Sequence, residues 1–463
     1  MVFSSITFLY YFFPIFLILY FAFYKFIAVQ NIIIVVFSLI FYTWGAPQYV
    51  ILLLALTLIN YFCGIYLPYF DNDTFKKKLI ITLGITVNVA SLFFFKYITA
   101  IFKLNIILPM GISFYTLQSI SYLVDVYRND VKAQKNFFYL LLYISMFPQL
   151  IAGPIVRYKT IEERITDRKA CADSILSGIG IFLVGLGKKV IIANSIGNLL
   201  VESNILSQSS VLSSWVGIIF YTIQIYFDFS GYSDIAIGIG KIIGFDFPEN
   251  FNYPYTATSI TDFWRRWHIT LSVFFKDYVF MPLNMKIKNV YFNLLIVWIL
   301  TGMWHGSSIN FLLWGLYYFV LLVIEKTFLL KKLRKLPKPL SKTVGFIYTI
   351  FFLLIANTIF YFTNLTDIKN AFMTMFCMKG NAFFDTYTIS LLKSNIYLII
   401  LSFVFATPLI KILNKKLFDF SVNNKFLFAL YSMVKVLILI IILILSTMLL
   451  ISETNNPFLY TQF

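Results

Sequence analysis

Long apolar runs with almost no charged residues recur along the whole chain, separated by short polar loops. Clear examples are Leu9–Phe23, Ile32–Phe41, Val50–Leu67, Leu79–Phe95 and Val436–Ile451. Several of these runs approach the length of about 20 residues that a helix needs to cross the hydrocarbon core of a bilayer. The pattern therefore predicts an all-α, polytopic transmembrane protein with about eleven or twelve helical spans or part-spans.

Composition supports the same fold class. Of 463 residues, 60% are hydrophobic and 12% are charged, whereas roughly a quarter of the residues in soluble domains are charged. A soluble fold could not cover this much apolar surface without large exposed patches. No hydrophilic stretch is long enough to form a separate soluble domain, so residues 1–463 are predicted to form a single membrane domain.

The formal net charge of +17 comes from basic residues in short loops between apolar runs. This placement is typical of loops held on the cytoplasmic face of a membrane and does not indicate a nucleic-acid partner. The first apolar run lacks a basic leader and a small-residue cleavage site, so we expect it to be the first span, with the N-terminus outside. The basic loop residues are Lys76–Lys78, Arg157, Lys159, Arg164, Arg168, Lys169, Lys188, Lys189, Lys286, Lys288 and Lys331–Lys338.

Proline and glycine interrupt two apolar segments, LPMGISFY around Gly111 and FPQLIAGPIVRY around Gly153. Backbone groups freed by such breaks must be satisfied by protein or water, because lipid offers no hydrogen bonds. The breaks indicate either a central cavity or kinks packed against neighbouring helices. No internal repeat is visible, which weighs against a transporter built from inverted repeats. Residues 106–325 hold most of the polar groups embedded in apolar sequence, so chemistry is expected there.

Residues 214–244 carry several polar side chains within an apolar stretch. Gln224 and Asp228 are four residues apart and share a helix face, and Asp234 follows. Ionisable groups at membrane depth usually face a bundle interior or water. Two interpretations stay open: the carboxylates pair with buried cations such as Arg157 or Lys188, or they contact substrate. The glycines at 238, 240 and 244 predict close helix packing.

The segment SITDFWRRWHITLSVFFKDY predicts an amphipathic helix that starts near Ile260. Ser259 and Asp262 have capping-box spacing, and Trp264, His268, Leu271, Phe275 and Tyr278 fall along one face. This helix suits the membrane interface, with His268 on its buried face. His268 is then either a satisfied core residue or part of an active site.

His305 lies in TGMWHGSS, between two apolar stretches. From Lys288 to His305 is 17 residues, about 25 Å of helix, and about one more full span leads to Glu325. If both charged ends are cytoplasmic, His305 lies inside the outer boundary of the bilayer. Gly306 to Ser308 form the break, with a serine placed to cap the returning helix. A neutral imidazole there is a candidate general base, or it hydrogen-bonds the helix break.

Other chemistry is poorly supported. Cys63, Cys171 and Cys377 are scattered and predict neither disulfides nor a thiolate site. Two histidines 37 residues apart, without a carboxylate at ligand spacing, do not predict a metal site. The sequence has no glycine-rich phosphate loop and no GxSxG motif.

At these residues the chain resembles the membrane-bound O-acyltransferase family, in its bacterial alginate O-acetyltransferase-like branch. The matching stretches run in family order from the first residue to the last. The chain departs from this branch at Asn284 and Met285, where glycines are usual, and at Tyr318, where a histidine is common. The stretches are MVFSSITFL, LPMGISFYTLQSISYLVDVYR, FPQLIAGPIVRY, YFDFSGYSDIAIGIGKIIGFDFPENFNYPY, DFWRRWHITLS, TGMWHG and NPFLYTQF.

The resemblance implies about a dozen helices around a thin centre, with a pit or tunnel joining the two membrane faces. It implies that His305 is the catalytic histidine and that His268 positions or assists it. The acyl group, expected to be acetyl, would come from a cytoplasmic thioester such as acetyl-CoA or an acyl carrier, with no bound cofactor. The candidates for contact with substrate or oxyanion are Gln224, Asp228, Asn252, Tyr255, Trp304, Ser308 and Gln118.

The same resemblance implies a multi-pass protein of the bacterial cytoplasmic membrane, surrounded by lipid. Its acceptor is expected to be a polysaccharide outside the membrane, or a partner protein that passes the acetyl group on. Two alternatives stay open. One is a D-alanyl transferase acting on teichoic acid, and the other is a transporter that moves an acyl donor or glycan without chemistry.

Overall fold

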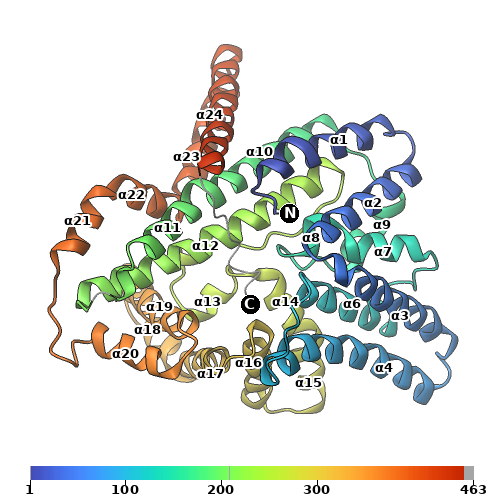
Figure 1. The fold of residues 1–463 in the computed structure, drawn as a ribbon, viewed down its shortest axis with the longest axis horizontal. Helices are drawn as coiled ribbons and strands as arrows, with labels where there is room; N and C mark the ends of the chain where they lie inside the picture. The colour runs from blue at the N-terminus through green and yellow to red at the C-terminus, as the bar shows by residue number, and fades with distance from the viewer. Residues whose placement is uncertain (1, 208, 453–463) are drawn as a thin grey trace.

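The computed structural model describes residues 2–207 and 209–452, and every regular element in these ranges is a helix. The closing stretch NPFLYTQF lies outside the described residues. Figure 1 shows α10 and α12 side by side through the molecule, and α24 projecting away from the rest. The first part of the chain forms η1 (Phe8–Phe12), α1 (Phe13–Ala22), α2 (Ile27–Gly45), η2 (Pro47–Tyr49), α3 (Val50–Tyr69), α4 (Thr74–Phe93), η3 (Phe94–Ile98) and α5 (Thr99–Ile101).

The middle part begins with helices that are short or interrupted, and it includes the longest helix, α12. These elements are α6 (Ile112–Tyr127), α7 (Phe137–Ser145), α8 (Phe147–Leu150), α9 (Tyr158–Thr166), α10 (Ala172–Gly187), η4 (Lys188–Asn194), α11 (Ser195–Glu202), η5 (Ile205–Ser207) and α12 (Val211–Ile242). Next come η6 (Pro254–Thr256), α13 (Ile260–Trp264), α14 (Ile269–Phe275), η7 (Lys276–Phe280), α15 (Met281–Lys286), α16 (Val290–His305) and α17 (Ile309–Ile324).

The last part forms η8 (Glu325–Leu329), α18 (Leu330–Leu333), α19 (Lys338–Tyr361), α20 (Leu365–Met375), α21 (Thr386–Ser394), α22 (Ile396–Phe405), α23 (Leu409–Ser421) and α24 (Lys425–Ser452). In the described part of the chain, eight helices are long and apolar enough to cross a membrane. The pair α21 and α22, bent by 66°, adds a broken span, and Phe8–Ala22 and Val290–His305 are shorter apolar helices. This agrees with the predicted polytopic fold of spans and part-spans.

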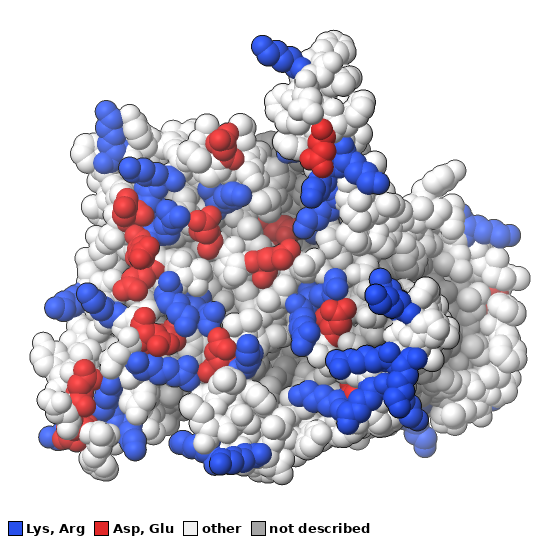
Figure 2. Space-filling model, turned by 180° about the vertical axis from the view of Figure 1, so that it is seen from behind, with Lys and Arg blue, Asp and Glu red and all other residues white. Residues whose placement is uncertain are grey.

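Two of the basic loops, around Lys77 and Lys159, lie near each other at the end of α6. The Lys77 ammonium lies 5.1 Å from the Tyr127 ring at the end of α6, and Lys159 pairs with Asp130 at 3.9 Å just beyond it. Arg157 pairs with Asp277 at 2.7 Å, which joins this group to η7. Figure 2 shows groups of Lys and Arg side chains spread over the face behind the view of Figure 1. This arrangement is the one expected of a positively charged cytoplasmic face.

The first helix runs toward the same basic loops. Near the end of α1, the Tyr20 hydroxyl accepts a hydrogen bond from Arg168 at 2.8 Å. Arg168 also donates to the Asn31 side chain at 2.6 Å, near the start of α2. At the other end of this segment, Phe3 is buried against Phe147 and against Tyr232 of α12. The orientation of the first span, with the N-terminus outside, stays a prediction.

The prediction that Lys188 and Lys189 lie in a loop is wrong, because both belong to η4, in the middle of a continuous helical span. Lys188 pairs with Asp234 at 2.6 Å, and Lys189 pairs with Asp228 at 2.5 Å. The two carboxylates of α12 therefore bind cations of the neighbouring span, which supports the interpretation as structural pairs. An isolated charge at this depth would be costly, and pairing lowers that cost.

Glycines bring α10 and α12 into close contact. A Cβ atom on Gly185 would lie 2.7 Å from the Gly231 carbonyl oxygen, and one on Gly238 would lie 2.6 Å from the Phe182 nitrogen. The predicted close packing is thus confirmed at Gly238. Gly240 instead faces the Phe247 ring, and Gly244 has a φ of +84° just after α12. Gly244 is therefore a left-handed residue at a helix end and not a packing residue.

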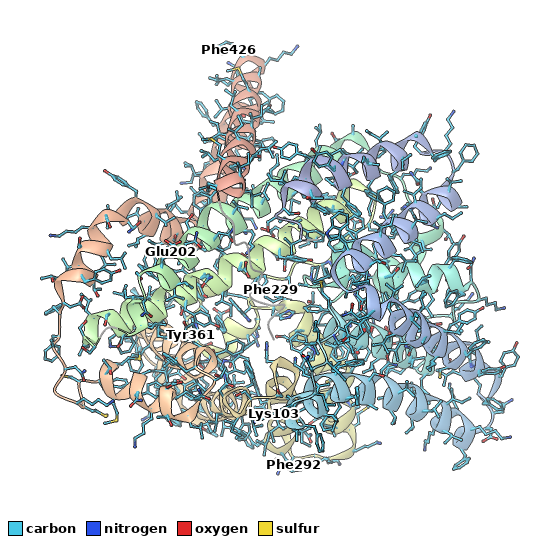
Figure 3. All side chains as sticks on the ribbon, in the orientation of Figure 1. Lys103, Glu202, Phe229, Phe292, Tyr361 and Phe426 are labelled. Carbon is cyan, nitrogen blue, oxygen red and sulfur yellow. The ribbon has the colours of Figure 1, made fainter. Side chains whose placement is uncertain are left out.

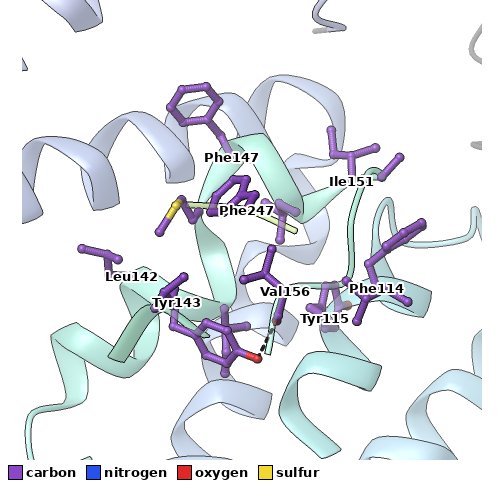
Figure 4. Close-up of a cluster of buried hydrophobic side chains, with 14 of the residues drawn as sticks. Phe114, Tyr115, Leu142, Tyr143, Phe147, Ile151, Val156 and Phe247 are labelled. Carbon is purple, nitrogen blue, oxygen red and sulfur yellow. Dashed lines mark hydrogen bonds between the residues drawn. The ribbon is translucent and has the colours of Figure 1, made fainter. Parts of the chain in front are cut away.

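The interrupted segments pack against neighbouring chain, and a cavity of about 230 Å³ also lies beside the break at Gly111. The structure therefore has features of both alternatives. A Cβ atom on Gly111 would lie 2.3 Å from the Leu150 carbonyl oxygen. Figure 4 shows the buried side chains around the second break, with the Tyr143 hydroxyl donating to the Val156 carbonyl at 3.0 Å. Freed backbone groups find protein partners there, as predicted, since the Ile155 N–H donates to the Thr270 hydroxyl at 2.9 Å.

The α10–α12 contact can be tested with a matched pair of glycine variants. Gly185→Ala should lower the free energy of unfolding by about 1–3 kcal/mol, because its Cβ would press on the backbone of α12. Gly180→Ala, on the same helix, would meet only the Leu439 side chain at 3.9 Å and should leave the stability equal or higher. Thermal unfolding of the detergent-purified proteins measures both. Equal melting temperatures for the two variants would contradict the packing described here.

Candidate active site

His305 is the last residue of α16, directly before the turn that leads into α17. Gly306 is extended, with φ −176° and ψ 170°, and α17 packs back along α16 as a helical hairpin. Ser308 occupies the predicted N-cap position of α17, but its hydroxyl donates to the Thr363 carbonyl at 3.0 Å instead of capping the helix. The predicted position of the break is therefore confirmed, and the predicted side-chain cap is wrong.

The end of α16 is capped from a different helix. Lys96, in η3, donates a hydrogen bond to the Trp304 carbonyl, and the Tyr97 hydroxyl donates to the Met303 carbonyl at 2.6 Å and the Gly306 carbonyl at 3.1 Å. The last carbonyls of a helix have no partner within it. Residues of a π-helical turn thus satisfy them at membrane depth, where water and lipid would not.

The His305 side chain is buried among aromatic rings. Its ring centroid lies 5.0 Å from that of Trp304, 4.9 Å from that of Trp314 and 5.3 Å from that of Phe360. Only 4% of the residue is exposed. These contacts fix the imidazole at the junction of the hairpin and leave one small crevice beside it, which is described below.

His268 does not lie within a continuous amphipathic helix, so that prediction is wrong. It has a left-handed backbone, with φ 42° and ψ 54°, and stands between the short helices α13 and α14. The chain turns sharply there, and helical periodicity does not extend across the turn. The prediction that His268 is buried is confirmed, since 1% of it is exposed.

Asn250 holds the His268 turn in place. Its side-chain oxygen lies 3.2 Å from His268 Nδ1 and accepts hydrogen bonds from the Thr270 N–H and hydroxyl at 3.3 and 2.8 Å. Its side-chain nitrogen donates to the Gly153 carbonyl at 3.3 Å and to Ser233 on α12 at 3.1 Å. One buried asparagine therefore joins the histidine, the interrupted segment around Gly153 and α12.

The rings of both histidines contact the ring of Trp304. The Trp304 ring centroid is 6.0 Å from that of His268 and 5.0 Å from that of His305. The Trp304 indole donates to the Ser113 carbonyl at 3.3 Å, at the start of α6. The structure thus brings together three of the predicted site residues, from segments that are far apart in the sequence.

Three hollows follow the α16–α17 hairpin from one end to the other. A cavity of about 260 Å³ lies beside the middle of α16 and the end of α17, with Arg265, Lys276 and Lys326 in its lining. A crevice of about 20 Å³ contains His305, Tyr255, Trp314, Tyr318 and Phe360. A cavity of about 510 Å³, which we call the outer cavity, lies beyond the end of α16. Its lining residues are Phe95, Lys96, Thr99, Ile106, Leu108, Tyr221, Gly306, Ser307, Ser308, Phe311, Tyr361 and Thr363.

The crevice adjoins both larger cavities. Trp264 lines the crevice and the cavity on the basic side. On the other side, His305 and Phe360 of the crevice are followed in the chain by Gly306 and Tyr361 of the outer cavity. His305 therefore lies at the constriction between two cavities at opposite ends of the hairpin. A pit or tunnel that joins the two membrane faces, as the resemblance implies, stays a prediction.

The remaining predicted site residues are dispersed. Tyr255 lines the crevice and donates to the Thr222 carbonyl, and Ser308 lines the outer cavity. Gln224 packs against Gly197, Asp228 pairs with Lys189, and Asn252 is held through its backbone N–H to the Arg266 carbonyl. Those three residues are not in the lining of the three hollows. Gln118 is fully buried on α6, outside that lining as well.

Comparison with known proteins shows the family of this chain. A model of the membrane-bound O-acyltransferase family matches residues 131–365, a range that contains both histidines. The chain belongs to the membrane-bound O-acyltransferase family. It is 37% identical over 366 residues to the probable alginate O-acetylase AlgI of Azotobacter vinelandii, which covers 75% of this chain and 73% of that protein. It therefore falls in the alginate O-acetylase-like branch of these membrane O-acyltransferases.

Two other relatives differ in the polymers that their names specify. The peptidoglycan O-acetyltransferase of Helicobacter pylori is 35% identical over 390 residues, or 75% of this chain and 74% of that protein. The teichoic acid D-alanyltransferase of Bacillus subtilis is 31% identical over 240 residues, or 48% of this chain and 60% of that protein. Membership of the family thus accounts for the acyltransferase activity. The donor, the acceptor and the acyl group must be inferred from the crevice and the cavities.

The role of Asn250 gives a prediction for the enzyme. Asn250→Ala should lower the rate of acyl transfer about 10–100-fold, because His268 loses the partner that orients it. Asn88→Ala is the matched control, since Asn88 is also buried and also forms several hydrogen bonds, with Asn60 and Gly84. Both variants should lose about 1–3 kcal/mol of stability. A similar loss of turnover in both, at equal amounts of folded protein, would refute a specific role for Asn250.

Proposed function

We propose that this O-acyltransferase moves an acetyl group from a thioester donor, which enters from the basic cytoplasmic face, to a hydroxyl group of a polysaccharide outside the membrane. The observation that carries this proposal is the position of His305 at the constriction between two cavities at opposite ends of the α16–α17 hairpin. Donor and acceptor can each occupy one cavity and meet at the histidine.

The two cavities differ in charge as their proposed ligands do. Arg265, Lys276 and Lys326 line the cavity on the basic side, and such cations favour a donor that carries phosphate groups. Acetyl-CoA and a phosphopantetheine-bearing acyl carrier both meet this description. The orientation that puts the basic loops in the cytoplasm puts the N-terminus outside.

In the proposed mechanism His305 is the general base. It takes the proton of the acceptor hydroxyl, whose oxygen attacks the thioester carbonyl carbon. The carbon–oxygen ester bond forms as the carbon–sulfur bond breaks, and His305 returns the proton to the departing thiolate. His268, held by Asn250 on the other side of Trp304, positions the Trp304–His305 segment.

The size of the crevice favours acetyl over larger acyl groups. A volume of about 20 Å³ is close to that of one water-sized probe, which leaves room for a methyl group beside His305. The crevice wall is mostly aromatic, with Asn357 as its one amide and no acidic residue among the lining residues. A D-alanyl group would bring an ammonium with no anionic partner, which burial disfavours. D-alanyl transfer is therefore the second candidate function, and the Bacillus subtilis relative supports it.

The relatives named for alginate and peptidoglycan support a polysaccharide as the acceptor. A partner protein outside the membrane that passes the acetyl group to the polymer fits the same cavity. Both routes begin with transfer at His305, so both require this residue.

The central test uses His305→Ala in inside-out membrane vesicles that contain the acceptor polysaccharide. Labelled acetyl thioester added outside should label the polymer in the lumen for the wild type, and at least about 10³-fold less for the variant. The matched control is Trp215→Phe, because Trp215 lies on α12 outside the three hollows. Wild-type labelling by His305→Ala would refute the proposed base, and label that enters the lumen unchanged would indicate a transporter.

The choice of acyl group is tested by enlarging the crevice. Trp314→Ala removes the ring that lies 4.9 Å from His305, so butyryl transfer should rise at least about tenfold relative to acetyl transfer. Competing acetyl and butyryl thioesters in one reaction give this ratio directly. An unchanged ratio would show that the crevice does not set the length of the acyl group, and faster D-alanyl than acetyl transfer by the wild type would favour the second candidate.

A further inference from the structure

The outer cavity has one charged residue in its lining. Of the residues that form it, Lys96 alone carries a charge, whereas Thr99, Ser307, Ser308 and Thr363 carry hydroxyl groups. The Tyr221 and Tyr361 rings lie 4.8 Å apart, edge to face, on the same wall. A volume of about 510 Å³ is in the range of sites that hold small ligands. The wall of the cavity is therefore mostly apolar and partly aromatic, with several hydroxyl groups and one charged residue.

Lys96 is buried, with 7% of the residue exposed. Its ammonium has three N–H donors, and its recorded contacts in residues 2–207 and 209–452 are the Trp304 carbonyl and the Trp304 ring, at 5.8 Å from the centroid. Neither contact carries a full negative charge. The partial negative charge at the end of α16 stabilises the cation in part. Donors remain for a ligand in the cavity that Lys96 lines.

The buried Lys189 is paired differently, since it has a carboxylate partner on α12, Asp228, at 2.5 Å. The buried Arg168 has no carboxylate partner among the described residues, but it donates to the side chains of Tyr20 and Asn31. Lys96 is buried to a similar extent as Lys189 and has no carboxylate partner in the described part of the chain. A desolvated ammonium favours an anionic partner strongly. The cavity beside it is the space from which such a partner can come.

We propose that the outer cavity binds an anionic sugar unit of the acceptor polysaccharide, with Lys96 as the residue that pairs with its negative group. This inference rests on the proposed function, which makes a polysaccharide the acceptor. The hydroxyl groups of the lining provide hydrogen bonds for a sugar, and the two tyrosines provide flat surfaces. The Lys96 cap joins this binding site to His305, because the carbonyl that it holds belongs to the peptide bond between Trp304 and His305.

The experiment measures binding of two saccharides to the detergent-purified full chain by calorimetry. One is an oligosaccharide of uronic acids, and the other is the same oligosaccharide with its carboxyl groups reduced to hydroxymethyl groups. The wild type should bind the charged form at least about tenfold more tightly, because a charge-assisted hydrogen bond replaces a neutral one. Added salt should reduce this preference.

Variants of two lysines test whether the charge of Lys96 determines the preference for the charged saccharide. Lys96→Gln keeps a donor for the Trp304 carbonyl but removes the charge, so it should bind both saccharides alike, and Lys96→Arg should retain the preference. Lys103→Gln is the matched control, because Lys103 is exposed and lies two residues after α5, outside the cavity lining. Figure 3 labels Lys103, and it labels Tyr361 of the cavity wall. Lys103→Gln should bind as the wild type does.

The outcomes distinguish this inference from the proposed function. Equal binding of both saccharides by the wild type, or an unchanged preference in Lys96→Gln, would overturn the role of Lys96 while acetyl transfer to the polymer still occurs. An equal loss of binding affinity for both saccharides in Lys96→Gln would also overturn the role of Lys96, since that result shows a structural role only. Failure of the wild type to bind either form, together with failure to label the polymer, would refute the polysaccharide acceptor itself.

Discussion

The architecture of this protein depends on one constraint, namely that a backbone group freed by a helix break inside a membrane must find a partner in the protein. The two breaks that matter most meet this constraint with side chains from distant segments. Lys96 and Tyr97 hold the carbonyls at the end of α16. Thr270 and Asn250 hold the backbone around Gly153. Each set of partners is adjacent to one of the two histidines, so the bonds that repair the breaks also position the site.

Contacts between the neighbouring helices fix the positions of these two breaks relative to each other. Two ion pairs and a row of glycines lock α10 and η4 against α12, and α12 in turn carries Ser233, which binds Asn250. The aromatic rings around Trp304 fill the space between the histidines. A shift of α12 would therefore reach His268 through a single asparagine. This explains why so many buried polar groups of the chain are concentrated in its middle part.

Much of the fold could be predicted from the sequence, because apolar runs of membrane length leave few alternatives to helices. The break at His305 was also predictable, since glycine and serines follow it at the depth given by flanking charges. The helix around His268 was not. Its periodicity is helical on both sides, but α13 ends at Trp264 and a turn over residues 265–268, with the left-handed His268, separates it from α14. Lys188 and Lys189 were misplaced for a similar reason, because two adjacent lysines usually mark a loop and their carboxylate partners lie far along the chain.

Lys96 and Asn250 gave weaker signals. Lys96 stands alone in the run FFFKYI, and a lysine near the end of a span usually reaches toward the membrane surface. Its contact with Trp304 depends on how two spans pack, which the sequence does not specify. Asn250 lies in the stretch FPENFNYPY, in which the sequence predicts a site role for Asn252. Two asparagines two residues apart cannot be ranked without knowing which one faces the histidine.

The narrowness of the crevice beside His305 has a consequence for the cell as well as for the reaction. A space of about 20 Å³ holds about one water molecule, so this path contains no continuous column of water between the two cavities. Protons and ions then cannot follow the substrates through it. Under the proposed function, a small neutral group would then cross the bilayer here while the membrane keeps its electrical potential.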